Sequence, residues 1–509
     1  MRIPCCLDSL SKIILVGVIS CSALFNIARF GLCCRLVLQR SVAGALLLTL
    51  SLPFSAAART PRRPPNIVLI FCDDLAYADV GCFGAKNVRT PNIDRLARAG
   101  TRFTSFYVSQ PVCSASRASL LTGCYANRIG IHGALSPNSK IAMNTNEWTL
   151  ARSLKAAGYA TAMFGKWHLG QRAPHLPTAY GFDEYFGLPY SNDMWPNHPE
   201  AMPGAYPPLP LIEGREVIEL MPDQRLLTRR YTERAVAFVR NNADRPFFLY
   251  LAHSMPHVPL FASSDFAGRS PHGLFADVIE ELDWSVGQVL SAVHDAKLEK
   301  DTWVIFTSDN GPWLSYGDHA GSAGKYREGK GTVFEGGVRV PCIMSWPGKI
   351  PEGRECATPM MTIDLYPTIA CRANAPMGPL VIDGRDAWSV VSAKVGAKSA
   401  HSEYLFYYNT GELQAMRSGR WKLLFPHKSR TLAGRDGGRG GNPAKYEELK
   451  VGLELYDLES DPSETRNVAS QRADVVTRLQ AATQRRRLEL GDSLTGIAGT
   501  GIRPPARVE

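Results

Sequence analysis

Four short, mostly apolar runs constrain the fold of this 509-residue chain more than any other feature of its sequence. They span residues 67–71, 160–164, 247–251 and 303–306. Because the apolar residues are continuous rather than alternating, each run is typical of a strand buried on both faces, as in a parallel sheet covered by helices. Apolar residues recur at helical spacing between the runs, most clearly within residues 275–293. This alternation of strands and helices predicts an α/β core.

Polar side chains follow each of the four runs. In chain order they are Asp73 and Asp74, then Lys166 and His168, then His253 and His257, and finally Asp309 and Asn310. Parallel sheets bind their ligands beyond the carboxyl ends of the strands. We therefore expect carboxylates, a lysine and histidines to lie together at one edge of the sheet.

The pattern changes after about residue 390, where short strand-like segments separated by turns predict a small antiparallel sheet. The expected strands are residues 404–408, 413–416, 421–425 and 453–458, with a helix at 472–488 packed on them. Residues 427–443 are rich in Gly and Arg, so we expect a mobile surface loop there. The expected organisation is a leader at 1–58, an α/β domain at 65–390, an antiparallel α+β domain at 391–490 and a poorly ordered tail at 491–509.

The charge of the chain excludes one class of function. The sequence contains 57 lysines and arginines against 47 acidic residues, a net charge of +10. This excess is mild, and no dense basic stripe interleaved with aromatic residues appears. We therefore expect no nucleic acid partner, whereas a preference for anionic ligands stays open.

The N-terminus has the pattern of a targeting sequence. Apolar runs at residues 13–25 and 42–52 are each too short to span a bilayer comfortably, and the second ends in Ser55-Ala56-Ala57-Ala58, which resembles a signal-peptide cleavage site. We expect an exported protein, periplasmic or extracellular, with no membrane span in the mature chain. A lipid-anchored form, processed at Cys21, is the alternative.

The most informative segment is residues 111–123, Pro-Val-Cys-Ser-Ala-Ser-Arg-Ala-Ser-Leu-Leu-Thr-Gly. Cys113 precedes a small-residue turn and helix, so a thiolate or an oxyanion there would lie at a positive helix terminus. Arg117, four residues on, can reach the same place. The residues alone leave open whether Cys113 is reactive or a buried structural thiol, because a thiol nucleophile needs a positioned histidine that spacing does not reveal.

From about Pro65 to its end, the chain resembles the type I sulfatases, most closely the arylsulfatase A-like enzymes. The first family signature is matched by Cys113, Arg117, Leu120-Leu121, Thr122 and Gly123, and the second by Gly158-Tyr159-Ala160-Thr161 with Gly165-Lys166-Trp167-His168. Further matches are Asp73-Asp74, Pro256-His257-Val258-Pro259, Ser308-Asp309-Asn310-Gly311, Gly329-Lys330-Gly331-Thr332, Glu335-Gly336-Gly337, Leu455-Tyr456-Asp457-Leu458 and Asp461-Pro462. The resemblance implies an alkaline-phosphatase-like fold, a large and mostly parallel sheet sandwiched by helices, with a smaller C-terminal domain.

The resemblance also implies hydrolysis of sulfate monoesters, either aryl or carbohydrate sulfates. A formylglycine-generating maturation enzyme would oxidise Cys113 to an aldehyde that hydrates to a geminal diol. One diol oxygen would attack sulfur, and the second would then collapse to the aldehyde and release sulfate. Ala115 stands where the family usually has proline. This departure bears on maturation, because the modifying enzyme reads the motif in the unfolded chain.

The site residues follow from the same resemblance. Asp73, Asp74, Asp309 and Asn310, with the modified Cys113, would bind Ca²⁺, or less favourably Mg²⁺, and their hard oxygen atoms suit such an ion. Lys166, Lys330 and His257 would bind the sulfate group, while His168 and Arg117 would act on the diol. For His253 and His319 we expect core packing or substrate contact.

Two other functions stay open at this point. The first is a phosphatase or phosphodiesterase of the same superfamily; these enzymes generally use a Thr or Ser nucleophile and two zinc ions, so Cys113 and Asn310 argue against it. The second is a catalytically silent binder of sulfated glycans, in which Cys113 remains a thiol. We expect loops at residues 189–210 and 427–443 to determine which substrate is bound.

Overall fold

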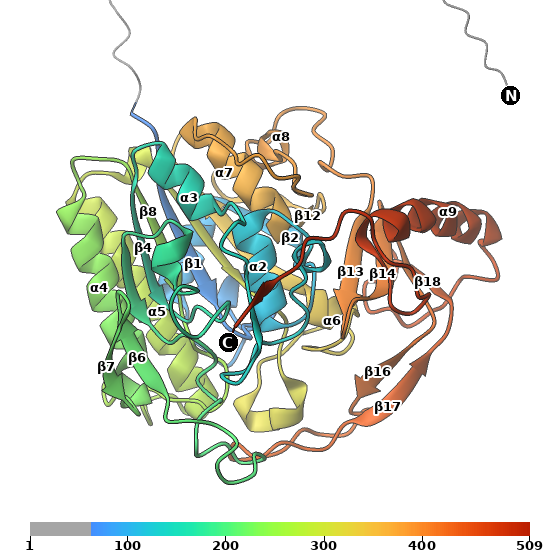
Figure 1. Cartoon of the computed structure of the whole chain (residues 1–509), viewed down its shortest axis with the longest axis horizontal. Helices are drawn as coiled ribbons and strands as arrows, with labels where there is room; N and C mark the ends of the chain where they lie inside the picture. Colours follow the sequence, from blue (N-terminus) through green and yellow to red (C-terminus); the bar gives the residue numbers. More distant parts are fainter. Residues whose placement is uncertain (1–62, 509) are drawn as a thin grey trace, which may run out of the picture. The chain divides into compact units, whose positions relative to one another are not determined.

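The computed structural model describes residues 63–508, and its central element is an eleven-stranded sheet (Figure 1). From one edge to the other the strands are β11 (Arg354–Cys356), β2 (Thr101–Tyr107), β10 (Arg339–Ser345), β9 (Thr302–Ser308), β1 (Asn66–Cys72), β8 (Phe247–Ala252), β4 (Ala160–Gly165), β5 (Glu184–Gly187), β6 (Pro210–Glu213) and β7 (Glu216–Leu220), while β12 (Met360–Met361) pairs with β2. The leader predicted at residues 1–58 lies outside the described residues.

The four predicted strands are neighbours in the middle of this sheet. The order β9-β1-β8-β4 contains only parallel pairs, and every residue of these four strands is buried. Strands β10 and β6 pair antiparallel with their neighbours, so the sheet is mixed toward its edges. The parallel centre is confirmed, and it brings four carboxyl ends to one edge of the sheet.

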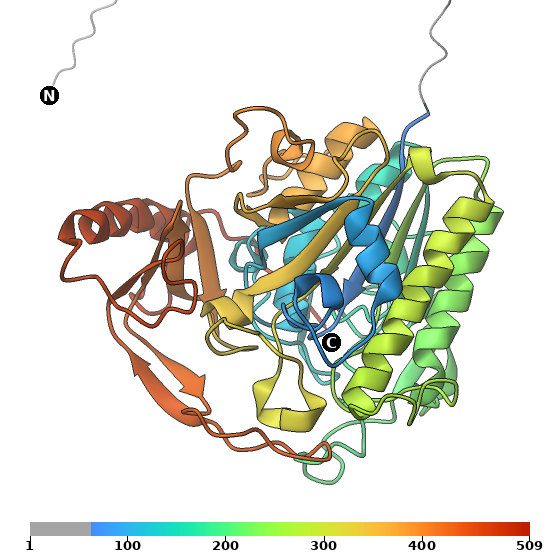
Figure 2. The ribbon, with the colours of Figure 1, turned by 180° about the vertical axis from the view of Figure 1, so that it is seen from behind.

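Helices cover both faces of the sheet (Figures 1 and 2). On one face lie α2 (Cys113–Thr122), α3 (Leu150–Ala156) and α7 (Leu365–Ala373), and on the other lie α1 (Pro91–Arg98), α4 (Leu227–Asn241) and α5 (Leu274–Asp295). Alternate residues of β1 point to opposite faces, so Leu69 joins the core beneath α2 and Ile70 joins the core beneath α5. Burial on both faces explains why the four apolar runs are continuous.

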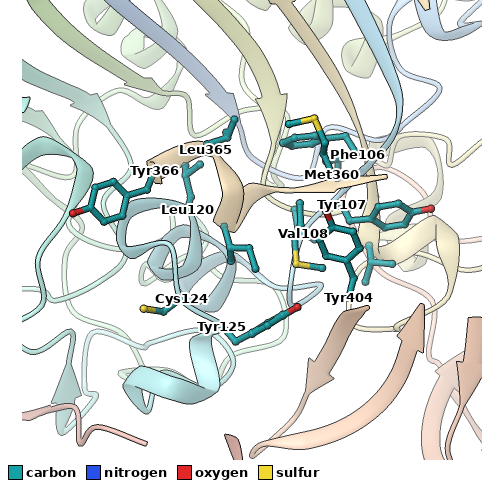
Figure 3. Close-up of a cluster of buried hydrophobic side chains, with 14 of the residues drawn as sticks. Phe106, Tyr107, Val108, Leu120, Cys124, Tyr125, Met360, Leu365, Tyr366 and Tyr404 are labelled. Carbon is teal, nitrogen blue, oxygen red and sulfur yellow. The ribbon is translucent and has the colours of Figure 1, made fainter. Parts of the chain in front are cut away.

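Helix α2 is fixed in place by the first of these cores. Its Leu120 lies beside Leu365 and Tyr366 of α7, and Phe106 of β2 lies in the same cluster (Figure 3). The helix ends at Thr122 and is capped by Gly123, which has a φ of +67° and donates its N–H to Ser119 O at 2.9 Å. A helix buried along its whole length holds its first residue in one position relative to the sheet.

The C-terminal part of the chain contains the expected antiparallel sheet. Its order is β13 (Tyr404–Tyr408), β14 (Glu412–Ser418), β15 (Trp421–Leu424) and β18 (Glu454–Asp457), and α9 (Ala473–Leu490) packs on it. The short helices α6 (Glu335–Val338) and α8 (Trp388–Val391) complete the set of α-helices in residues 63–508. None of the helices in this range is both long and apolar enough to cross a membrane.

Two segments differ from the expectation. The supposed loop at 427–443 begins with β16 (His427–Thr431), which pairs with β17 (Glu447–Val451) to form a two-stranded hairpin. The tail runs back over the α/β domain, where Arg503 binds Glu147 at 2.8 Å and β19 (Ala506–Arg507) pairs with β3 (Ile141–Ala142). Both segments are polar and are ordered by hydrogen bonds and ion pairs, which apolar periodicity does not reveal.

Candidate active site

The ends of β1 and β9 bring four oxygen-bearing side chains together. Asp73 and Asp74 follow β1, and Asp309 and Asn310 follow β9, its parallel neighbour. The backbone N–H of Asp74 donates to Asp309 Oδ1 at 3.0 Å, and Asn310 Nδ2 donates to Asp74 Oδ1 at 2.7 Å. All four residues are buried. The predicted metal ligands are therefore adjacent.

The donor set of this cluster fits a hard divalent cation. Ligand atoms of Asp73, Asp74, Cys113 and His257 lie within 4.8 Å of one another. Asn310 Oδ1 is buried and accepts no hydrogen bond from any residue between 63 and 508. Burial and the negative charge of the neighbouring Asp73 raise the pKa of Asp309 to about 7. The carboxylates therefore repel one another, and a cation bound between them would favour their charged forms. Carboxylate and amide oxygens are the ligands that Ca²⁺ and Mg²⁺ prefer.

Cys113 is the first residue of α2 and faces this cluster. Its Sγ donates to Asp73 Oδ1 at 3.4 Å. Burial and then the charge of Asp73 raise the pKa of the Cys113 thiol far above its ordinary value. The thiol is therefore protonated at neutral pH, and an unmodified Cys113 is not prepared to act as a thiolate nucleophile.

Arg117 lies one helical turn after Cys113 and is fully buried. Its Nη2 and Nε donate to Asp309 Oδ2 at 2.8 and 3.1 Å, and its Nη1 donates to Lys166 O at 3.0 Å. Burial opposes the charge of the guanidinium, but Asp309 and then Asp73 raise the pKa of Arg117, so it stays charged. It ties α2 to the ends of β9 and β4.

Two lysines contact the same carboxylates. Lys166, after β4, donates its Nζ to Asp73 and, at 2.9 Å, to Ser191 Oγ. Lys330 donates its Nζ to Asp74 Oδ2 at 2.9 Å. Burial opposes ionisation of Asp73, but nearby cations, Lys166 foremost, hold the pKa of Asp73 well below its usual range. Positive charge thus lies on both sides of the candidate metal ligands.

The two histidines predicted to act in the site are both neutral, each with one nitrogen free of a strong contact. His168 Nε2 donates to Leu135 O at 2.8 Å, so its Nδ1, which has no partner among the described residues, carries the lone pair. His257 Nδ1 donates to Val258 O at 2.5 Å, and its Nε2 lies 3.6 Å from Asp74 Oδ2. Burial lowers the pKa of both rings, and the nearby lysines lower it further.

A pocket of about 250 Å³ opens over Cys113. Its lining residues are Val112, Cys113, Gly133, Ala134, His168, Ser191, Asp193, Met194, His257, Trp313, Lys330, Tyr408, Asn409 and Arg430. Four predicted site residues line this pocket, Cys113, His168, His257 and Lys330. Other lining residues come from the loop after β5, from Trp313 and from the C-terminal part of the chain. A second pocket, of about 400 Å³, is lined by Leu96, Leu290 and Val304 and contains none of the predicted residues.

The structure thus gathers every predicted catalytic and metal-binding residue at one edge of the sheet, but not every histidine considered. His253 is buried in the core, with its Nε2 3.2 Å from Ser285 Oγ, and His319 does not line the pocket. Ser191, which contacts Lys166, was not predicted individually, although it lies in the segment 189–210 that was expected to determine which substrate is bound. Arg430 was not predicted individually either. It lies on β16 in the segment 427–443, which was expected to be a mobile loop that helps to determine which substrate is bound.

Comparison with known proteins identifies this chain. The family model named Sulfatase matches residues 65–375, and the C-terminal region of aryl-sulfatase matches residues 400–496. Arylsulfatase A of Homo sapiens is 39% identical over 440 residues, which cover 81% of this chain and 85% of that protein. N-acetylgalactosamine-6-sulfatase of Canis lupus familiaris is 39% identical over 403 residues, or 75% of each chain.

Solved structures agree with this assignment. The crystal structure of Ps i-CgsB in complex with k-i-k-neocarrahexaose matches with a TM-score of 0.68 at 30% identity, covering 83% of this chain and 92% of that one. The predicted resemblance and the alkaline-phosphatase-like fold are both confirmed. The chain belongs to the sulfatase family, is similar to arylsulfatase A, and is a sulfuric ester hydrolase.

Proposed function

We propose that this sulfatase cleaves aryl or carbohydrate sulfate monoesters with a formylglycine made from Cys113 and a Ca²⁺ ion held by Asp73, Asp74, Asp309 and Asn310. The observation that carries the proposal is the position of Cys113, whose Sγ lies 3.4 Å from Asp73 with its pKa raised by burial. A protonated thiol is a poor nucleophile, whereas an oxygen nucleophile at this position would lie among candidate metal ligands and buried cations.

The formylglycine would supply a geminal diol, of which one oxygen attacks sulfur and the other provides the route for releasing sulfate. Ala115, which departs from the family pattern, is compatible with the folded site. Its backbone N–H donates to Gly133 O at 3.2 Å, a hydrogen bond that proline could not make. A formylglycine-generating enzyme that accepts this alanine is thus the partner required for maturation.

The metal ion would supply positive charge that favours an ionised hydroxyl and neutralises a sulfate oxygen. The modified side chain at position 113 would complete its ligands. Family precedent and the three buried carboxylates favour Ca²⁺ over Mg²⁺, which keeps several waters and is usually bound through one or two carboxylates.

The described side chains have roles that fit this chemistry. Lys166 and Lys330 hold buried positive charge where negative charge grows on the sulfate oxygens, and His257 lies beside them as a further sulfate contact. His168 offers its free Nδ1 to take the proton from the hydroxyl that must collapse. Arg117 holds that hydroxyl and fixes Asp309.

Sulfate release from a purified, matured preparation tests the proposal. The substrates are 4-nitrophenyl sulfate and a panel of monosulfated hexoses. Cys113→Ala should lower turnover by on the order of 10⁴-fold or more without changing the thermal midpoint, because nucleophile removal has effects of this size. Cys371→Ala removes an exposed cysteine and should leave activity unchanged. Full activity of Cys113→Ala would refute the assigned nucleophile. A wild type that releases no sulfate would instead leave the silent-binder alternative, to be tested by glycan binding.

We further propose that the protein is exported, on the strength of the leader pattern at residues 1–58. N-terminal sequencing of protein from the periplasm and the medium tests this. A mature chain beginning close to residue 59 is expected, and an intact leader on cytoplasmic protein would contradict it.

A further inference from the structure

Several polar atoms in the described part of the chain are buried without a hydrogen-bond partner, and three of them belong to residues that line the pocket or to the candidate metal ligands. These three are Asn310 Oδ1, His168 Nδ1 and Asp193 Oδ1. A buried polar atom without a partner lowers stability, so each one calls for a reason. The proposed function explains two of these atoms: Asn310 Oδ1 would bind the metal ion, and His168 Nδ1 would take a proton from a hydroxyl. It does not explain Asp193 Oδ1.

Asp193 lies in the loop after β5, two residues beyond Ser191, and is only 7% exposed. Its Oδ2 is 3.8 Å from His198 Nε2, which is too long for a hydrogen bond. Burial opposes its charge, but neighbouring basic groups lower the pKa of Asp193: His257 when it is protonated, then Lys166 and Lys330. Hydrogen bonding with the Ser191 hydroxyl lowers this pKa as well. The pocket wall therefore contains an ionised carboxylate with an unused acceptor.

The other charged groups of the pocket are already engaged. Lys330 pairs with Asp74 at 2.9 Å, and Arg430 donates its Nε to Lys330 O at 3.1 Å. A sulfate group would be repelled by the charge of Asp193 and attracted by that of Lys330. Asp193 is thus suited to face the alcohol part of a substrate rather than its sulfate.

We propose that Asp193 is a specificity-determining residue that accepts a hydrogen bond from a free hydroxyl on the substrate's alcohol, so that the preferred substrates are carbohydrate sulfates. This inference rests on the proposed sulfatase function. A site built to bind a hydroxyl discriminates strongly against an analogue that lacks one, because the buried acceptor is then left unpaired. An aryl sulfate without hydroxyls would leave the carboxylate in that state.

The test compares kcat/KM for two substrates, 4-nitrophenyl sulfate and the best-cleaved member of the hexose sulfate panel. Asp193→Ala should lower kcat/KM for the sugar by about 10- to 100-fold, the range expected for a hydrogen bond to a charged group. Its kcat/KM for the aryl sulfate should stay within about threefold, since that substrate makes no such bond. Asp193→Asn, which keeps a neutral acceptor, should show an intermediate loss on the sugar.

Two controls separate recognition from damage. Glu200→Ala removes an exposed acidic residue that lies in the same loop but outside the pocket. It should leave kcat/KM unchanged for both substrates. The thermal midpoint of Asp193→Ala should stay close to that of the wild type, because Oδ1, one of the two lost carboxylate oxygens, has no partner among the described residues.

Each remaining outcome is decisive. Equal losses on both substrates, no loss on the sugar, or a wild type that cleaves only the aryl sulfate would overturn the role of Asp193. A wild type that cleaves no sulfate ester at all, the aryl sulfate included, would instead overturn the proposed function on which the inference rests.

Discussion

Replacing Lys422 with methionine removes the centre of a buried ion cluster that joins the two parts of the fold. Lys422, on β15, is fully buried and pairs with Glu335 and Glu464, each at 2.9 Å. Glu335, the first residue of α6, also accepts a hydrogen bond from Tyr107 at 2.6 Å and pairs with Arg339 at 3.2 Å. Glu464 in turn accepts the backbone N–H of Glu335 at 2.6 Å. Lys422 thus connects the C-terminal sheet to the segment that follows the Lys330 loop.

The size of the effect follows from what the substitution leaves behind. Removing one partner of a buried ion pair costs about 3–5 kcal/mol, because the remaining charge is uncompensated. Glu335 would keep Arg339, but Glu464 would lose its cation. Burial already raises the pKa of Glu464 to about 7, and losing Lys422 would raise it further. Glu464 would therefore bind a proton at pH 7, which limits the expected decrease in the free energy of unfolding to about 3 kcal/mol. The loss should grow as the pH rises above 7.

The matched control is Lys428→Met in the same part of the chain. Lys428 pairs with Glu448 at the same distance, 2.9 Å, but the two side chains are 73% and 48% exposed. An exposed pair contributes less than about 1 kcal/mol. Urea unfolding at pH 7 and pH 8.5 should therefore show a much lower midpoint for Lys422→Met than for Lys428→Met, and a wider gap at the higher pH. Equal midpoints for the two variants would refute the reasoning.

Three further perturbations give independent checks. Gly311→Ala would place a Cβ 1.8 Å from Gly336 O, so it should displace the neighbouring Asn310 and reduce kcat; wild-type kinetics would contradict this. Chelation by EGTA should abolish sulfate release and added Ca²⁺ should restore it, with Asn310→Ala requiring more Ca²⁺ than the wild type; activity that survives exhaustive chelation would exclude the metal. Burial raises the pKa of Asp79 to about 7, so its contribution to stability is present below the unfolded pKa and is lost as the pH rises through 7. In Asp79→Asn the urea midpoint should therefore fall less steeply as the pH rises through 7. An unchanged slope would contradict the raised pKa of Asp79.

The sheet and the position of the candidate metal ligands at one edge were predictable from local sequence, because they depend on burial and on chain order. The role of these residues as ligands was predicted from the family resemblance. Strands β1, β4, β8 and β9 are covered on both faces, so their apolar runs are continuous. Asp73 and Asp309 follow two of these strands directly, so the parallel arrangement alone places them at one edge.

Other site residues were not predictable in this way. Lys330 lies in a loop whose path is fixed by distant contacts, and only the family resemblance assigned it to the site. His257 was expected at this edge of the sheet because it follows β8, but its role in binding sulfate came from the resemblance. Asp193 lies in the segment 189–210, which was expected to determine which substrate is bound, but a loop without periodicity gives no reason to choose this residue over its neighbours. Strand β16 contains Lys428 and Arg430, and most of its side chains reach solvent. It is held partly by the bond from Arg430 to Lys330 O, a contact between residues 100 positions apart.

The most direct test of the account is the mass of the tryptic peptide that contains Cys113, measured in preparations that differ in specific activity. Preparations made with increasing amounts of maturation enzyme should contain increasing fractions of the aldehyde at position 113. The account predicts that sulfate release is proportional to that fraction and extrapolates to zero when the thiol is intact. Full activity in a preparation whose Cys113 is entirely unmodified would contradict it.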